Sequence, residues 1–238
     1  PLSALADGLG LSRVATDGSH VIRGARGRRI SEKEAPDWLF DVTEVQHEAG
    51  ADPDQLDMRA YDDQTVYGGR DVVFPGGYAG ILTALAGDYT VLPDAVVRSV
   101  SHRAETVRLA LRDGRMFTAD AVIVTVPLGV LKSGRLAFDP ELPKDTRRAI
   151  ARVGMGTLDK LYLRFSDVFW DADKTWLLTP DTDLPPGQFN QWLNLARVLN
   201  EPILCGFNGG SAALALAAES DAALVARAVS VLERAYPA

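Results

Sequence analysis

The sequence is poor in the residue types that build disulfides and metal centres. Its 238 residues include one cysteine, Cys205, so the chain has no internal disulfide and no cysteine-based metal site. Cys205 lies in the apolar stretch 202–207, which predicts a small buried core residue rather than a nucleophile. The three histidines, His20, His47 and His102, lack the spacing of metal ligands, so we assign the chain no metal.

Membrane-spanning runs and several catalytic motifs are also missing from the sequence. No stretch approaches the ~20 apolar residues that cross a bilayer. There is no Gly-x-Gly-x-x-Gly motif or P-loop, no Gly-x-Ser-x-Gly elbow and no His-Glu-x-x-His motif. We therefore expect no membrane partner and a cytoplasmic location. The chain begins at Pro1 and stops directly after a predicted helix, so we expect both ends to be truncated, with any targeting segment removed.

What is present is the composition of an ordinary globular protein. Hydrophobic residues make up 47% of the chain and charged residues 24%. This length can form one good core, or two small cores that share an interface. The formal net charge of −7 argues against nonspecific nucleic-acid binding and mildly favours cationic ligands.

Helical and strand patterns are mixed along the chain, which predicts an α+β protein with a mixed β-sheet. Ser31 and Glu34 have the spacing of a capping box, Ser220 is a natural helix cap, and Asp113-Gly114 is a strong hairpin turn. The predicted helices cover residues 2–11, 31–46, 78–86, 142–153 and 221–235, and the predicted strands cover 95–102, 106–112, 117–126, 161–165 and 203–207.

Residues 121–132 form a largely apolar run. It is rich in β-branched residues and does not alternate, so it predicts a strand that Pro127 ends. Val122 and Val124 should then be buried on both faces of a sheet. On this prediction Val124→Asp would prevent folding, because an unpaired buried carboxylate costs several kcal/mol.

Lys160 follows a Gly-x-Gly turn and opens an alternating strand. Leu161, Leu163 and Phe165 should share one face of that strand, with Lys160 and Tyr162 on the other face. One interpretation is a solvated edge lysine. The other is a functional cation, which should lie in a cleft between two domains and not at an outer sheet edge.

Three stretches together resemble the flavin-dependent amine oxidases, and within them the polyamine oxidases and lysine-specific histone demethylases. They are VVFPGGY at 72–78, TVPLGVLK at 125–132, and residues 139–171, which contain Lys160 and Phe169-Trp170. Residues 202–213 also fit the family. The resemblance, with varying strength, covers residues 68–237.

This resemblance implies a fold with an FAD domain and a substrate domain, each assembled from separate stretches. Residues 1–70 and 135–238 would belong to the substrate domain, and residues 71–134 would form part of the FAD-binding domain. The family reaction transfers a hydride from the carbon beside an amine nitrogen to FAD. The imine then hydrolyses, and oxygen reoxidises the flavin with release of hydrogen peroxide.

The resemblance also implies roles for individual residues near the cofactor. Lys160 matches the lysine that holds a water against the reactive flavin nitrogen, where a cation stabilises the electron-rich reduced flavin. Val97 matches a position whose backbone holds the adenine, and Thr125, Val126 and Pro127 match a turn near the flavin. The alternative for these last four is that they are structural residues of a buried sheet.

Phe189 and Trp192 match aromatic positions that border the substrate cavity. Aromatic walls suit a deprotonated amine on an alkyl chain and tolerate a cation. The alternative is that both rings belong to the hydrophobic core.

The chain departs from the family pattern in ways that affect the cofactor. The glycine-rich loop that holds the pyrophosphate is absent, and so is the segment that closes over the flavin. The region between Leu11 and Gly68 is also short. We therefore expect this chain alone not to hold FAD.

An FAD-dependent desaturase or porphyrinogen-type oxidase and a non-catalytic binding module remain alternatives. The sequence leaves open the amine, covalent FAD attachment and the oligomeric state.

Overall fold

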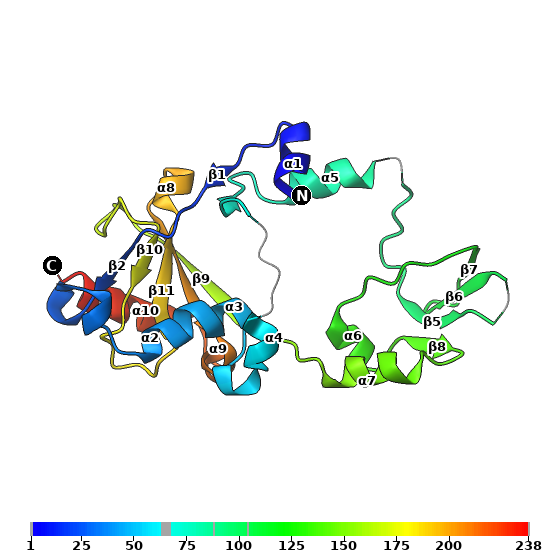
Figure 1. Cartoon of the computed structure of the whole chain (residues 1–238). Helices are drawn as coiled ribbons and strands as arrows, with labels where there is room; N and C mark the ends of the chain where they lie inside the picture. Colours follow the sequence, from blue (N-terminus) through cyan, green and yellow to red (C-terminus); the bar gives the residue numbers. More distant parts are fainter. Residues whose placement is uncertain (1, 63–67, 88, 104, 238) are drawn as a thin grey trace. The chain divides into compact units, whose positions relative to one another are not determined.

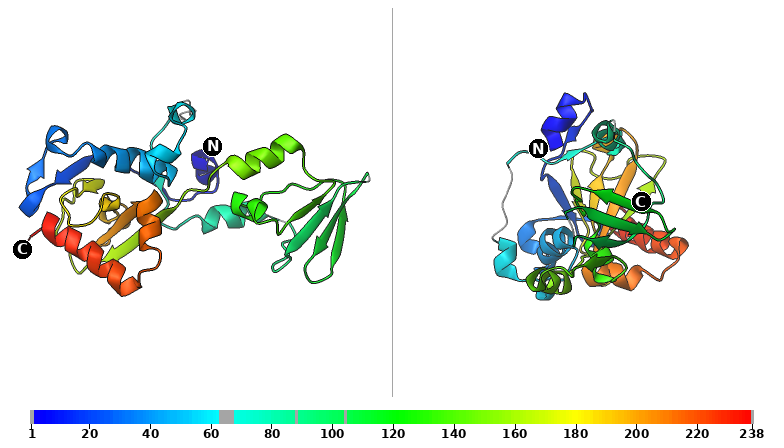
Figure 2. Two further views of the ribbon diagram at one scale, coloured as in Figure 1. Left: turned by 90° about the horizontal axis from the view of Figure 1, so that it is seen from below. Right: turned by 90° about the vertical axis from the view of Figure 1, so that its right-hand side faces the viewer.

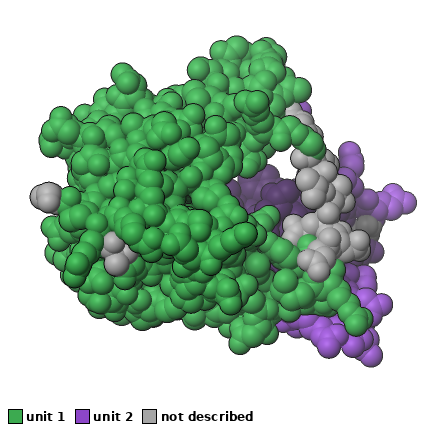
Figure 3. Space-filling model, turned by 60° about the vertical axis from the view of Figure 1, so that its left-hand side comes forward, with its two compact units in different colours: residues 1–85, 156–238 green, residues 86–155 purple. Residues whose placement is uncertain are grey.

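The computed structural model describes residues 2–62, 68–87, 89–103 and 105–237. The chain forms two compact units, which Figure 3 colours separately: unit 1 contains residues 1–85 and 156–238, and unit 2 contains residues 86–155. The predicted substrate and FAD domains follow from a family resemblance, whereas these units are defined by their compactness. The predicted domain assignment therefore stays a prediction. No helix in the described ranges is long and apolar enough to cross a bilayer.

Unit 1 is built on a six-stranded sheet in the order β3-β2-β10-β11-β12-β9 (Figure 1). Strands β2 and β10 pair in parallel, while the other neighbours are antiparallel, so the sheet is mixed as predicted. Its strands are β2 (His20–Arg23), β3 (Arg29–Ile30), β9 (Leu158–Arg164), β10 (Trp176–Leu178), β11 (Gln188–Asn194) and β12 (Ile203–Gly209).

Helix α10 (Asp221–Ala235), red in Figure 1 and Figure 2, packs against one face of this sheet. Its bounds are those predicted, and Ser220 caps it by accepting a hydrogen bond from the Ala223 amide at 3.3 Å. The core between them contains Leu163, Phe189, Trp192 and Leu204 from the sheet and Ala228, Val231 and Leu232 from the helix. Each large side chain buried there contributes about 1.5–3 kcal/mol.

The predicted helix over residues 31–46 is confirmed only in part. Ser31 and Glu34 form the expected capping box, but it begins only the short 3-10 turn η2 (Glu32–Glu34). Pro36 restricts the residue before it to extended backbone, and Ala35 has φ −72° and ψ 149°. The helical segment therefore starts later, as α2 (Trp38–Phe40), the π-helix η3 (Asp41–Gln46) and α3 (His47–Ala49).

The other elements of unit 1 are short. They are α1 (Leu2–Gly8), β1 (Val14–Ala15), η1 (Ala25–Gly27), η4 (Pro53–Gln55), α4 (Met58–Asp62), β4 (Val72–Val73), α5 (Ala79–Ala86, which ends at the unit boundary), α8 (Ala196–Leu199) and α9 (Gly210–Leu216). Strands β1 and β4 pair as a separate two-stranded sheet.

Unit 2 contains a four-stranded sheet in the order β7-β6-β5-β8. Strands β6 and β7 form the predicted hairpin, and Gly114 in its turn has φ 91°, a conformation that favours glycine. The elements are β5 (Val97–Ser101), β6 (Val107–Leu111), β7 (Met116–Ala119), α6 (Leu128–Lys132), β8 (Ala137–Asp139) and α7 (Lys144–Arg152).

The apolar run at residues 121–126 is not a buried strand, so that prediction is wrong. None of these residues is in a strand, and Ile123 is 89% and Val124 41% exposed. A strand is stable only when a neighbour accepts and donates its backbone hydrogen bonds. Among the described residues no segment pairs with this run. Its β-branched composition therefore does not produce a strand here.

Candidate functional site

Lys160 lies on β9 in a row of side chains that crosses three strands. The register of the sheet places Lys160 opposite Phe207 in β12, and Phe207 opposite Gln191 in β11. The Lys160 ammonium nitrogen is 5.5 Å from the centroid of the Phe207 ring. At this distance the electron-rich ring face attracts the cation.

The predicted faces of this strand are confirmed. Leu163 is buried in the core that α10 covers, and Leu161 and Phe165 pack against that core. Tyr162, which shares the face of Lys160, is 60% exposed. The alternation of the strand therefore presents Lys160 on the side away from the main core.

Lys160 is also on an outer strand, because β9 ends the six-stranded sheet. The expectation that it would avoid an outer edge is wrong, and this position is the one that a solvated lysine would have. Its side chain is exposed and forms no salt bridge with any carboxylate in the described part of the chain. The ammonium is therefore free to meet a bound group.

A buried histidine supports the same row from the helical segment above it. His47, at the start of α3, is 4% exposed, and its ring centroid lies 6.0 Å from that of Phe207. Its Nδ1 donates a hydrogen bond to Gln191 Oε1 at 2.7 Å. Burial lowers the pKa of His47, so the ring is neutral at pH 7.

The thiol of Cys205 is one row further along β12 and is inert. Cys205 is 1% exposed, which confirms the predicted core position. Burial raises its pKa to about 11, although its hydrogen bond with Tyr162 and the charge of Lys160 oppose the rise. A protonated, buried thiol does not act as a nucleophile.

The two predicted aromatic residues lie on the core side of the same sheet. Phe189 borders a cavity of about 380 Å³ that Asp159, Lys160 and Leu161 also line. Trp192 is opposite Gly206 in β12 and does not line this cavity. Lys160 and Phe189 thus border one cavity, although their side chains belong to opposite faces of the sheet.

Both aromatic rings are fully buried. Phe189 and Trp192 each have 0% exposure, and their rings stack with centroids 5.8 Å apart. The Trp192 Nε1 donates a hydrogen bond to Thr179 Oγ1 at 3.1 Å, which fixes the indole. This is the placement that the core interpretation expects, and their contact with substrate stays a prediction.

The four residues predicted to contact the cofactor all lie in unit 2. Val97 begins β5 and is half-buried, where it pairs with Leu111. Thr125, Val126 and Pro127 are exposed, in the run that precedes α6. These positions are accessible to a ligand, and their cofactor role stays a prediction.

Sequence reasoning missed His47 and Gln191. His47 was considered only as a metal ligand, and Gln191 was not singled out. Gln191 is 144 residues from His47 along the chain, and Phe207 is further away. No local sequence spacing therefore marks these three residues as neighbours. The structure, unlike the sequence, does mark this position. The π-helix η3 ends directly before His47, and π-helical turns are frequent at functional sites.

Comparison with known proteins connects this geometry to a family. The model of the family described as flavin containing amine oxidoreductase matches residues 29–238. "Lysine-specific histone demethylase 1 homolog 2" of Oryza sativa subsp. japonica is 30% identical over 210 residues, which cover 88% of this chain and 28% of the relative. "Polyamine oxidase 4" of the same organism is 32% identical over 187 residues, covering 79% of this chain and 38% of the relative.

A third relative agrees with these two. "Polyamine oxidase 2" of Arabidopsis thaliana is 30% identical over 187 residues, again 79% of this chain and 38% of the relative. This chain therefore spans well under half the length of the curated relatives it matches. The family match covers most of the chain, including β9 and the row around Lys160, and the chain belongs to the flavin-containing amine oxidoreductase family.

Proposed function

We propose that this chain is the substrate-binding part of an FAD-dependent amine oxidase that oxidises a C–N bond. The observation that carries the proposal is Lys160, an exposed cation with no carboxylate partner among the described residues, within the region that the family model matches. The substrate class is an amine, and the names of the relatives point to polyamines or to lysine side chains of histones.

The residues at Lys160 fit a flavin. An unpaired ammonium on an accessible strand can meet a ring that becomes electron-rich, and the Phe207 ring at 5.5 Å supports the side chain from one side. Bound FAD would supply the hydride acceptor of the reaction, with hydrogen peroxide as the by-product of its reoxidation. In unit 2, we assign backbone contacts with the cofactor to Val97, Thr125, Val126 and Pro127.

Each residue of the row has a distinct task in this proposal. Lys160 orients a water through its Nζ–H groups. The neutral His47 fixes Gln191 and packs on Phe207, so it holds the surface beneath the lysine without adding a charge that would repel it. Phe189, which borders the cavity beside Lys160, would supply an apolar wall for the alkyl part of the amine, and Trp192 would support that wall by stacking on the Phe189 ring. An apolar wall also excludes water from the reacting carbon.

Two measurements on the protein as its gene encodes it test this function. An absorbance spectrum should contain flavin bands, which a non-catalytic binding module would lack. Peroxide release should then be measured over polyamines, monoamines, amino acids and a methylated-lysine peptide. We expect release with at least one amine. Flavin bands without turnover of any amine would favour the desaturase or porphyrinogen-type alternative.

A further inference from the structure

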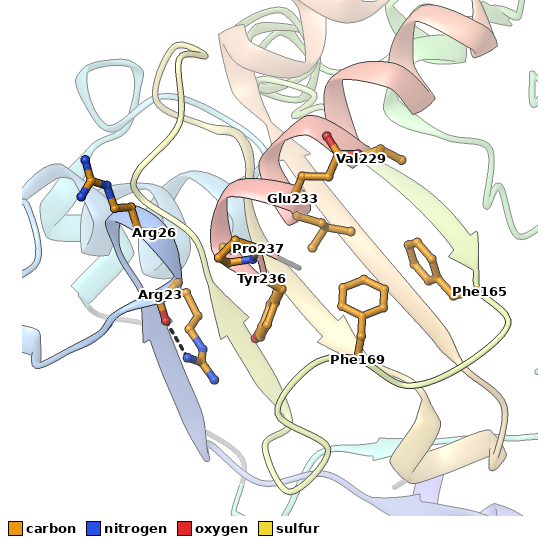
Figure 4. Close-up of a pocket in the computed structure, with 11 residues that line it drawn as sticks. Arg23, Arg26, Phe165, Phe169, Val229, Glu233, Tyr236 and Pro237 are labelled. Carbon is orange, nitrogen blue, oxygen red and sulfur yellow. Dashed lines mark hydrogen bonds between the residues drawn. The ribbon is translucent and has the colours of Figure 1, made fainter.

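A second cavity lies in unit 1 where β9 ends and α10 reaches its C-terminus. It has a volume of about 650 Å³, which is within the ~300–1,000 Å³ of small-molecule sites. Figure 4 shows Phe165 and Phe169, from the segment after β9, together with Val229, Glu233 and Tyr236 of the α10 end. Neither Lys160 nor any other residue of its row lines this cavity.

The aromatic wall of the cavity is held in place by edge-to-face contacts. The Phe169 ring centroid is 5.0 Å from that of Phe165, 5.0 Å from that of Trp170 and 5.8 Å from that of Tyr236. These pairs have interplanar angles of 88°, 86° and 73°, a favourable geometry for aromatic rings. Phe169 is nevertheless 46% exposed, so part of its surface remains open.

A buried carboxylate fixes the neighbouring wall. Asp171, whose side chain is 2% exposed, accepts two hydrogen bonds from Arg23, each of 2.8 Å, and one of 2.9 Å from the Tyr236 hydroxyl. Arg29 also pairs with the same carboxylate. The Arg23 guanidinium carbon lies 5.0 Å from the centroid of the Tyr236 ring. The cavity therefore exists before any ligand arrives.

The charges around the cavity do not balance. Asp171 neutralises only one of the two arginines that it contacts. At the rim, Arg26 and Glu233 are both exposed and neither has an ion pair with a described residue. Arg23, Arg26 and Arg29 thus carry one more charge than Asp171 and Glu233 neutralise, although Arg29 and Asp171 do not themselves line the cavity. The unit as a whole has 14 Lys and Arg residues against 24 Asp and Glu residues, so this excess is a local exception.

We propose that this cavity binds an organic anion with a flat apolar body, of the aryl carboxylate class. The body would pack on Phe169 and Val229. The carboxylate would lie at the rim toward Arg26, because the nitrogens of Arg23 already donate to Asp171 and to the Gly27 carbonyl. An aryl ammonium of the same size would contact the same rings, but the local excess of positive charge would repel it. This site is separate from the proposed oxidase chemistry, and binding to it requires no flavin.

Isothermal titration calorimetry of the full chain tests the proposal with a matched pair of probes. Naphthalene-2-carboxylate and 2-naphthylmethylamine share one ring system and differ in charge. We expect the carboxylate to bind one site with a dissociation constant below about 1 mM, a weak but measurable affinity. We expect the amine to bind at least tenfold more weakly.

Variants assign the binding to this cavity. Arg26→Gln should weaken carboxylate binding about threefold to fivefold, the range for an exposed charge contact, and Glu233→Gln should strengthen it. Arg28→Gln is the matched control, because Arg28 belongs to the same loop, pairs with Glu34 at 2.8 Å and does not line the cavity. It should bind like the wild type.

Phe169→Leu should weaken carboxylate binding at least fivefold while it keeps an apolar side chain and the fold. An unchanged far-UV circular dichroism spectrum would verify the fold, since Trp170 contacts Phe169 and its fluorescence should change. No carboxylate binding up to 5 mM, equal binding of the amine, or equal effects of Arg26→Gln and Arg28→Gln would each overturn the proposal.

Discussion

The neutral, buried state of His47 makes the stability of unit 1 depend on pH. His47 is 4% exposed and its pKa lies below the ordinary value of 6.5, because burial disfavours the imidazolium. In the unfolded chain the ring titrates normally. Below pH 6.5 the unfolded state therefore binds a proton that the folded state does not take up, and stability falls as the pH falls. Above pH 6.5 both states are neutral and this contribution vanishes.

The size of the effect follows from proton linkage. While the folded ring stays neutral, one histidine removes up to about 1.4 kcal/mol per pH unit below its unfolded pKa. Between pH 7.5 and 5.5 the upper limit of this loss is about 1.4 kcal/mol, which applies if the folded ring stays neutral throughout. That is a substantial part of the ~5–15 kcal/mol that stabilises a typical domain. The carboxylates with lowered pKa, such as Asp171, lose their contribution only at lower pH, near and below 3.8.

Urea unfolding at pH 7.5, 6.5 and 5.5 measures this slope. All four tryptophans of the chain lie in unit 1, so their fluorescence reports this unit alone. His47→Asn should be less stable at pH 7.5, because it leaves a void beside Phe207, but its pH slope should be flatter than that of the wild type. His102→Asn, an exposed histidine in unit 2, is the control. A wild-type slope retained in His47→Asn would refute the reasoning.

Three further outcomes follow from the structure. Gly206→Ala should destabilise unit 1 by about 1–3 kcal/mol in urea, because the new Cβ would lie 2.7 Å from Cζ3 of Trp192, whose indole is held by Thr179. Gly76→Ala is the control and should leave the stability unchanged, because Gly76 has open space around it. Equal urea midpoints for the two variants would contradict the close packing of Gly206 on Trp192. Val124→Asp should change the thermal midpoint little, with a cost of less than about 1 kcal/mol, since Val124 is 41% exposed; loss of folding would restore the buried-strand prediction. FAD titrated into this chain should show weak or no binding by flavin fluorescence, and a submicromolar dissociation constant would contradict the view that the pyrophosphate loop is needed.

Local pattern was enough to predict the elements that make their own contacts. The bounds of α10 follow from its apolar stripe and the Ser220 cap, and the β6–β7 hairpin follows from the turn at Gly114. The faces of β9 follow from simple alternation, which is why the face that Lys160 shares with Tyr162 could be predicted, whereas the edge position of β9 in the sheet could not. In each case the determining residues are near one another in sequence.

Features that depend on distant partners could not be predicted in this way. The four residues of β2 have no strong pattern of their own, and β2 forms because β10 pairs with it from across the chain. Asp171 carries no sequence signal for Arg23, which is 148 residues away. The prediction for residues 121–126 was wrong for the opposite reason. Their pattern favours a strand, but no described segment pairs with them.

The most direct test of the proposed function is Lys160→Met in the protein as its gene encodes it. Methionine keeps the apolar stem and removes the charge, so folding and flavin content should be unchanged. A lost interaction of ~3 kcal/mol with the reduced flavin would slow the affected step about a hundredfold. Stopped-flow absorbance should resolve flavin reduction and reoxidation separately.

Arg164→Met is the matched control, since Arg164 shares the strand and the face of Lys160 and, in the described part of the chain, forms an ion pair with Glu201 at 2.7 Å. We expect Lys160→Met to slow one of the two flavin steps about a hundredfold while Arg164→Met reacts like the wild type. Wild-type rates in Lys160→Met would contradict the account and leave Lys160 as a solvated edge lysine.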